Sequence, residues 1–336
     1  MQVDHCAIGF PHRAQSFGGP GSFQTRLIQE LNDRGFKVVY PDDSILPSVI
    51  LVVGGTARID WLIRCRRKGV RVIQRLDGIN WRHRVIECSS WYKFRSEIRN
   101  MLTRLVRQKL AHEVIYQSKF VKEWWKTIYG EDRITSHIVH NAVDLEEFYP
   151  TQNRSGIPPL IICAESILKN DDISMTLLAH LARDLISRGE IRGIRIIGFL
   201  GAKEKKRLSE FPGIELYGAV TRDRMPNLFR EADIFLNLDI NAACPNAVIE
   251  ALASGLPVVG FRTGALKELV PLDAGTLVNY GGDPWKLEEP DLMGLSDAIV
   301  SITNNLEQFS FGARRVAEAR FDINQMTDTY IKVLSQ

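Results

Sequence analysis

The sequence has few cysteines, no long apolar run, and no Cys or His residues at the spacing of metal ligands. Its five cysteines are scattered over 336 residues without a CxxC motif, which argues against a disulfide framework and a structural zinc site. No run of about 18 apolar residues could form a membrane-spanning helix. The first ten residues also lack the charged start and apolar run of a secretion signal. These absences predict a cytoplasmic protein without a bound metal.

The length and composition are those of a globular protein with more than one domain. A chain of 336 residues is about twice the usual length of one domain. Hydrophobic residues make up 45% and charged residues 25% of the sequence, which is ordinary for a folded protein and unlike a disordered one. Two domains, each with its own core, are therefore expected.

Positive charge is concentrated in residues 58–109, here called the basic segment. Its only acids are Asp60, Asp77, Glu87 and Glu97, against many arginines and lysines. Such an imbalance indicates an anionic neighbour, and we expect peripheral contact with an anionic membrane, at its cytoplasmic face. The alternative is an ordinary solvated helix face. Nucleic acid is not expected, because no RNA- or DNA-binding module accompanies the charge.

Short apolar runs alternate with amphipathic stretches, which predicts parallel α/β sheets. The alternation stops at residues 144–159, which are rich in proline and polar residues and are typical of a linker. We therefore predict an N-terminal domain over residues 1–150 and a C-terminal domain over 159–320. A last helix within 321–336 is expected to pack back on the first domain.

A glycine-rich loop follows the first predicted strand. Gly18, Gly19, Pro20 and Gly21 precede a helix predicted over residues 23–32. Glycines let backbone amides approach a ligand closely, and the positive end of the helix dipole attracts phosphate. The loop matches neither the dinucleotide fingerprint nor the P-loop. A tight turn that binds no ligand is the alternative.

A second helix start lies near the middle of the C-terminal domain. Pro245 and Asn246 begin a predicted helix, with asparagine expected to cap its first amides, and Gly255 ends it. The free amides at this start favour a diphosphate. Glu250, one turn inside, can accept hydrogen bonds from ribose hydroxyls, although an ordinary exposed acid is the alternative.

The run from Gly218 to Asp283 resembles the donor-binding half of family 4 glycosyltransferases. The similar parts are LYGAV at Leu216–Val220, the segment with Glu250 that continues to Pro257 and Val259, and Thr263-Gly264 with Glu268. In the N-terminal half, VIYQSKF at Val114–Phe120 and IVHNAVDLEEFYP at Ile138–Pro150 are similar more loosely.

The resemblance implies a GT-B fold, with two Rossmann-like, doubly wound parallel-sheet domains and a cleft between them. It also implies a glycosyltransferase that moves a sugar, with retention and without a metal or cofactor, from a nucleotide-sugar donor to a carbohydrate or lipid-linked acceptor. Residue chemistry and resemblance together assign catalytic roles to Lys169, Glu250 and Asp77. They assign donor contacts to Gly18, Gly19, Pro20, Gly21, Glu165, Lys169, Gly218, Val220, Pro245, Asn246, Ala247, Val248 and Glu250.

The chain departs from the family pattern at three places. Ala242 stands where the first acid of the E-x7-E element is expected, eight residues before Glu250. The family's diphosphate-binding arginine falls on Ala164 or Glu165, although Lys169 fits its lysine. A family histidine near the reacting sugar is replaced by Asp77. These departures keep two alternatives open, a catalytically silent GT-B protein that partners an active transferase and a nucleotide-sugar epimerase.

Overall fold

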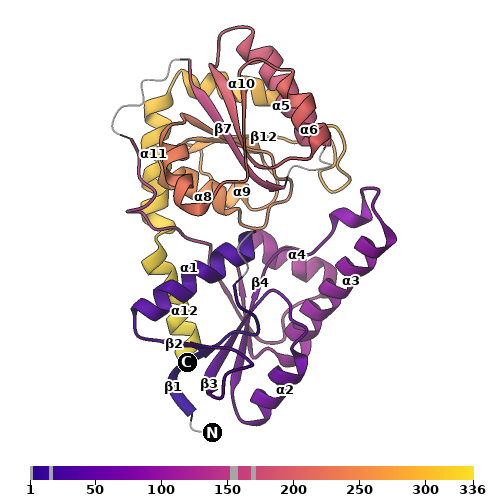
Figure 1. Cartoon of the computed structure of the whole chain (residues 1–336), viewed down its shortest axis with the longest axis vertical. Coiled ribbons are helices and arrows are strands. Elements are labelled where there is room, and N and C mark those ends of the chain that lie inside the picture. Colours follow the sequence, from indigo (N-terminus) through magenta and orange to yellow (C-terminus); the bar gives the residue numbers. More distant parts are fainter. Residues whose placement is uncertain (1–2, 15–17, 152–157, 168–171) are drawn as a thin grey trace. The chain divides into compact units, whose positions relative to one another are not determined.

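The computed structural model describes residues 3–14, 18–151, 158–167 and 172–336. These residues fall into two compact units (Figure 1). The N-terminal unit runs to Asn141 and also includes Asn324–Gln336, and the C-terminal unit is Ala142–Ile323. Each unit is built around one parallel sheet.

Six parallel strands form the sheet of the N-terminal unit, in the order β2-β1-β3-β4-β5-β6. Their bounds are β1 Val3–Gly9, β2 Lys37–Val39, β3 Leu46–Val53, β4 Arg71–Leu76, β5 Glu113–Tyr116 and β6 Thr135–Ile138. The strands are mostly continuous apolar runs, because helices cover both faces of such a sheet. All six were expected from the sequence, within a few residues at each end.

Helices lie on both sides of this sheet. They are α1 Gly19–Asp33, α2 Ile59–Arg67, α3 Ser90–Leu105, α4 Lys119–Tyr129 and α12 Ile323–Ser335. Helices α1 and α12 lie on one side, where the rings of Phe23 and Tyr330 are 5.3 Å apart, and α2 and α3 lie on the other (Figure 1). A core of buried side chains, among them Ile50, Val72 and Leu62, joins α2 to the sheet.

Helix α1 begins four residues earlier than expected. The predicted helix started at Phe23, whereas the structure begins it at Gly19, with Gly18 as the N-cap and a proline in its first turn. The glycines suggested a loop, but proline fits the first turn of a helix because its missing N–H would have no helical partner there. The glycine-rich segment is thus largely the helix start itself.

The sheet of the C-terminal unit also has six parallel strands, in the order β12-β11-β10-β7-β8-β9. They are β7 Leu160–Ile167, β8 Gly193–Phe199, β9 Ile214–Gly218, β10 Ile234–Asn237, β11 Val258–Phe261 and β12 Gly275–Val278. The innermost strands are the most apolar, and β10 and β11 are buried at every position.

The helices of the C-terminal unit include four that the sequence did not predict, at residues 202–209, 266–269, 292–303 and 306–320. The helices are α5 Asp172–Leu181, α6 Ala202–Ser209, α7 Met225–Arg230, α8 Asn246–Ala253, α9 Leu266–Leu269, α10 Leu292–Thr303 and α11 Leu306–Arg320. The region of α10 and α11 was interpreted as a long polar stretch. Both helices nevertheless bury one stripe, which includes Leu295 and Ile299 on α10 and Ala313 on α11.

Residues 144–151 of the predicted linker pack against the C-terminal unit and are hydrogen-bonded to it. Phe148 is buried and its ring lies 6.0 Å from that of Phe229. Arg314 of α11 donates hydrogen bonds from Nη1 to the carbonyls of Phe148 and Ala253, both at 2.8 Å. Residues 144–151 are therefore part of a packed element, whereas residues 152–157 of the predicted linker lie outside the described residues.

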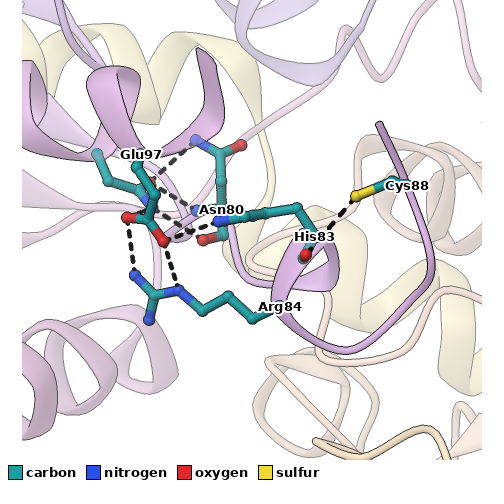
Figure 2. A network of polar contacts seen from close by, with 6 residues as sticks. Asn80, His83, Arg84, Cys88 and Glu97 are labelled. Carbon is teal, nitrogen blue, oxygen red and sulfur yellow. Dashed lines mark hydrogen bonds and ion pairs between the residues drawn. The ribbon is translucent and has the colours of Figure 1, made fainter. Parts of the chain in front are cut away.

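A polar cluster holds the first half of α3 against the segment before it (Figure 2). Glu97 accepts hydrogen bonds from Arg84 at 2.7 and 2.9 Å, and its Oε1 lies 2.8 Å from Nε2 of the buried His83. Asn100 exchanges hydrogen bonds with Asn80 at 2.9–3.0 Å. Hydrogen bonds from Arg84 and His83, together with the Arg84 charge, lower the pKa of Glu97 from 4.5 to about 2.

This cluster predicts an acid dependence of stability. Because the folded-state pKa of Glu97 lies below its unfolded value, its contribution is complete above about pH 4.5 and is lost as the pH falls towards about 2. We expect the stability difference between the native protein and Glu97→Gln to shrink over this range. Urea titrations of both proteins at several pH values measure it.

Glu87→Gln, at an exposed acid of the same segment, is the control for the loss of one charge. An equal pH dependence for the two variants would contradict the assignment.

Candidate active site

The sheet orders place the candidate residues where α/β proteins bind ligands. In the N-terminal unit the strand order reverses between β1 and β3, and in the C-terminal unit between β7 and β10. Ligands of open α/β sheets bind outside the carboxyl ends of the strands at such switch points. The glycine segment follows β1, Lys169 follows β7, and α8 follows β10.

The start of α1 is open around its glycines. Gly18 has φ +89°, a conformation that favours glycine. A side-chain carbon built on Gly18 or Gly19 would meet no described atom within 4 Å. Gly21, by contrast, is buried, and the N–H of Ser22 donates to the carbonyl of Gly18 at 3.0 Å. Backbone amides at this helix start can therefore be approached closely by an anionic group.

Asp77 lies directly after β4 and is paired with Arg75 of that strand. Its side chain is 22% exposed, whereas that of Arg75 is 1% exposed. The backbone carbonyl of Asp77 accepts a hydrogen bond of 2.8 Å from the indole N–H of Trp125. Asp77 is thus held by both its backbone and its side chain, with part of the carboxylate open to solvent.

Arg75 is the centre of a buried network at the carboxyl ends of three strands. Its Nη2 donates to Gln117 Oε1 and to Asn141 Oδ1, both at 2.7 Å. Gln117 follows β5 and Asn141 follows β6. The guanidinium also lies over the ring of Phe23, 3.8 Å from its centre. Because Phe23 belongs to α1, this one cation contacts both the carboxylate of Asp77 and the helix that begins at the glycine segment.

His12 is a second polar group near this edge. Its ring lies 2.7 Å from the hydroxyl of Thr56, and its carbonyl accepts a hydrogen bond of 2.7 Å from Gln24 of α1. Burial, followed by the charge of Arg58, lowers the pKa of His12. At neutral pH the ring is therefore uncharged and adds no positive charge beside the glycine segment.

In the C-terminal unit, α8 starts differently from the expectation. Pro245 is the N-cap and Asn246 is the first helical residue, so the predicted asparagine cap is wrong. Pro245 forms no side-chain cap, since proline offers no acceptor there. The amides of Asn246, Ala247 and Val248 are the first three of the helix, and in an α-helix such N–H groups point out of the helix start.

Glu250 is buried rather than an ordinary surface acid. It is 8% exposed, one turn inside α8, while the side chain of Val248 is fully buried in the core. At Val248 only the backbone N–H is therefore available to a ligand. At the end of β9, Gly218 has φ +69° and open space beside it among the described residues, and Val220 follows in the next loop, partly exposed.

Ala242 lies in a tightly packed turn after β10. Its carbonyl accepts the N–H of Ala265 at 2.8 Å. The preceding residue, Asn241, has φ +56° and its N–H donates to Thr263 Oγ1 at 3.2 Å. A side-chain carbon on Gly264 would lie 2.5 Å from the backbone N and O of Ala242. The turn is fixed by backbone contacts, and Ala242, only 4% exposed, leaves no carboxylate at this position.

Two of the predicted donor residues cannot be placed. Lys169 lies outside the described residues, and of Glu165 only the backbone, within β7, is described. The described residues hold no group of three or more His, Cys, Asp and Glu side chains arranged to bind a metal ion.

The sequence reading missed Arg75, Gln117 and Asn141. Arg75 lies within β4, Gln117 follows β5 and Asn141 follows β6. Gln117 and Asn141 are 42 and 66 residues from Arg75 in the sequence. The only signal in the sequence is an arginine inside the apolar run of β4, because a buried charge needs partners.

Comparisons with known proteins point to glycosyltransferases. Residues 158–305 match the family described as "Glycosyl transferases group 1". A D-inositol 3-phosphate glycosyltransferase of Xylanimonas cellulosilytica is 27% identical over 62% of this chain and 53% of its own length. One component of the human phosphatidylinositol N-acetylglucosaminyltransferase is 27% identical over 40% of this chain and 28% of its own length. The chain thus matches about half, or less, of these relatives.

Solved structures show the same fold over nearly the whole chain. Sucrose-phosphate synthase of Thermosynechococcus elongatus superposes with a TM-score of 0.76 at 14% identity, covering 97% of this chain and 98% of its own. HepE of Anabaena, solved with UDP and glucose, gives a TM-score of 0.68 at 15% identity, covering 98% and 99%. No described helix of this chain is long and apolar enough to cross a membrane. The chain has the GT-B fold, and residues 158–305 of its C-terminal unit are similar to the group 1 glycosyl transferases.

Proposed function

We propose that the chain transfers a sugar from a nucleotide-diphosphate sugar to a carbohydrate or lipid-linked acceptor. The observation that carries the proposal is the start of α8, in the part of the chain that matches the family. There the amides of Asn246, Ala247 and Val248 precede the buried carboxylate of Glu250. Amides of this kind suit a diphosphate, and a carboxylate suits the hydroxyls of a ribose.

Transfer proceeds with retention and without a metal in this proposal. The bond between the anomeric carbon and the diphosphate oxygen breaks, the acceptor hydroxyl oxygen bonds to the same face of the sugar, and the hydroxyl proton passes to the leaving diphosphate oxygen. Negative charge grows on the leaving diphosphate, where the amides of α8 and the ammonium of Lys169 stabilise it. The acceptor is bound by the N-terminal unit, at Asp77, and the basic segment provides peripheral contact with an anionic membrane.

A thermal-shift screen against nucleotide sugars tests donor binding. A ligand that binds only the folded protein raises its unfolding temperature in proportion to the logarithm of the ligand concentration. We expect a shift with at least one uridine, guanosine or adenosine diphosphate sugar. The absence of any shift across the screen would overturn the proposal.

Lys169→Ala is expected to lower turnover about a hundredfold, which corresponds to about 2.7 kcal/mol of transition-state stabilisation. The loss is due to the missing positive charge beside the leaving diphosphate. Sugar transfer, or hydrolysis of the donor in the absence of acceptor, measures the rate. Lys203→Ala, at an exposed lysine of α6 in the same unit, is the matched control. Unchanged turnover of Lys169→Ala would remove this residue from the mechanism.

One observation favours a second function, that of a catalytically silent partner of an active transferase. Ala242 replaces the acid of the E-x7-E element, and it is only 4% exposed in a turn where a carbon added to Gly264 would lie 2.5 Å from its backbone. Donor binding in the thermal-shift screen without turnover, by the protein alone, would favour this function over transfer.

A further inference from the structure

Helix α3 exposes its apolar side chains and buries polar ones. The buried residues of α3 are Ser96 and Asn100. Trp91 is 68% exposed, Phe94 57% and Met101 58%. An ordinary surface helix turns its apolar stripe towards the core, so α3 has the opposite arrangement.

The exposed apolar residues, together with the half-buried Ile98, form one continuous stripe. Trp91, Phe94, Ile98, Met101 and Leu105 are separated by alternating steps of three and four residues, which places them on one face of a helix. The stripe is about 21 Å long, and the rings of Trp91 and Phe94 are 6.0 Å apart. Ile98 is two residues, or about 200° around the helix, from both Ser96 and Asn100. The stripe therefore points away from the sheet, and in Figure 1 α3 lies at the margin of its unit.

The cluster in Figure 2 fixes this orientation. Asn100, on the buried face, is bonded to Asn80. Glu97, beside that face, is bonded to Arg84 and His83. Because these contacts bind one side of the helix, the opposite side is presented to the surroundings.

Positive charge flanks the stripe on α3. Lys93, Arg95, Arg99 and Arg104 are all exposed. Glu97 is the only acid of the helix, and it is paired with Arg84. A second copy of the chain seated on this face would bring like charges together, which disfavours self-association. The face is complementary to an apolar surface that also carries negative charge.

We propose that the exposed face of α3 docks on an anionic lipid bilayer, with its stripe in the interface and its basic residues at the headgroups. A helix with an apolar stripe and basic flanks lies in the plane of a membrane surface, and tryptophan favours the interface. This inference rests on the proposed membrane contact of the basic segment and narrows it to one helix face. It is independent of sugar transfer.

Co-sedimentation with vesicles tests the proposal. One set contains phosphatidylcholine alone, and the other contains equimolar phosphatidylcholine and phosphatidylglycerol. We expect binding to the anionic vesicles, about tenfold weaker for Trp91→Ser/Phe94→Ser and for Arg95→Gln/Arg99→Gln at low salt. Phe311→Ser, at a 71% exposed aromatic of α11, is the matched control and should bind as the native protein does.

Other outcomes overturn the proposal in distinguishable ways. If only Arg67→Gln/Lys68→Gln, at the C-terminal end of α2, binds the vesicles more weakly, the membrane contact is made near α2 and not by α3. No binding to either vesicle would remove the contact altogether, whereas the thermal-shift response to nucleotide sugars reports donor binding separately. A dimer in solution that dissociates in Trp91→Ser/Phe94→Ser would identify a second copy as the occupant.

Discussion

Arg75→Met is expected to lower the free energy of unfolding by about 3–5 kcal/mol, the usual result when one partner of a buried ion pair is removed. Arg75 is 1% exposed and bonds Asp77, Gln117 and Asn141. Methionine fills part of the volume but removes the cation that Asp77, Gln117 and Asn141 share. Urea titration followed by tryptophan fluorescence measures the loss, and Trp125 reports locally because its indole bonds Asp77.

Two further variants test the cause of the Arg75 effect. Arg13→Met removes an arginine of the same unit that also pairs with an acid, Asp42, and lies over a ring, but its side chain is 67% exposed. We expect a loss of at most about 1 kcal/mol there. The double variant Arg75→Met/Asp77→Ala should lose less than the sum of its single variants, because no carboxylate is left unpaired. Equal losses for Arg75→Met and Arg13→Met would contradict the buried network.

The Arg75 network also bears on the proposed acceptor site. Arg75→Lys keeps the charge but cannot reach three acceptors with a planar fork. If Arg75 positions Asp77, Arg75→Lys lowers the turnover by more than the loss of folded protein explains.

Gly264→Ala is expected to lower the free energy of unfolding by about 4 kcal/mol, from backbone strain and overpacking together. Gly264 has φ +57°, and its added carbon would lie 2.5 Å from two backbone atoms of Ala242. The backbone of Asn241 and Ala242 cannot move aside as a flexible side chain would. Urea titration measures the loss, and activity should fall with it, because the displaced turn follows β10 in the donor unit.

Gly189→Ala is the matched control for Gly264→Ala. It lies in the same unit at φ +71°, with no described atom within 4 Å of the added carbon. The expected loss in the free energy of unfolding of Gly189→Ala is therefore that of the backbone strain alone, about 1 kcal/mol. A loss at Gly264 no larger than that at Gly189 would show that the turn can open to accept a side chain.

The sequence predicted the strands of the two sheets except β12, because most of them are short, continuous apolar runs, such as Ile234–Leu238 and Val49–Val53. It failed where local chemistry was ambiguous. The glycines before Phe23 suggested a loop, although proline can begin a helix. Asn246 was expected to cap α8, but the helix starts one residue earlier than that role requires. The buried stripes of α10 and α11 were not recognised in the sequence, because polar residues lie between their members.

Motif chemistry indicated the segments that we propose to bind a diphosphate, but it did not predict how their side chains are held. Arg75 illustrates the limit. Its partners are recognisable only when β4, β5 and β6 are aligned, and no local pattern links residues so far apart. Glu250 was recognised from its motif, whereas its burial depends on the packing of α8 against the strands.

The return of the chain to its first unit has a consequence for synthesis. Residues 324–336 complete the N-terminal unit, where Tyr330 covers Phe23 and Arg34 bonds Asp328 and Asn324. During translation the N-terminal unit is incomplete until the last helix has been synthesised. By then the C-terminal unit is already fully translated. A fragment that ends at Asn141 would expose the face of α1, and joining residues 324–336 to it through a short flexible tether should restore a folded half.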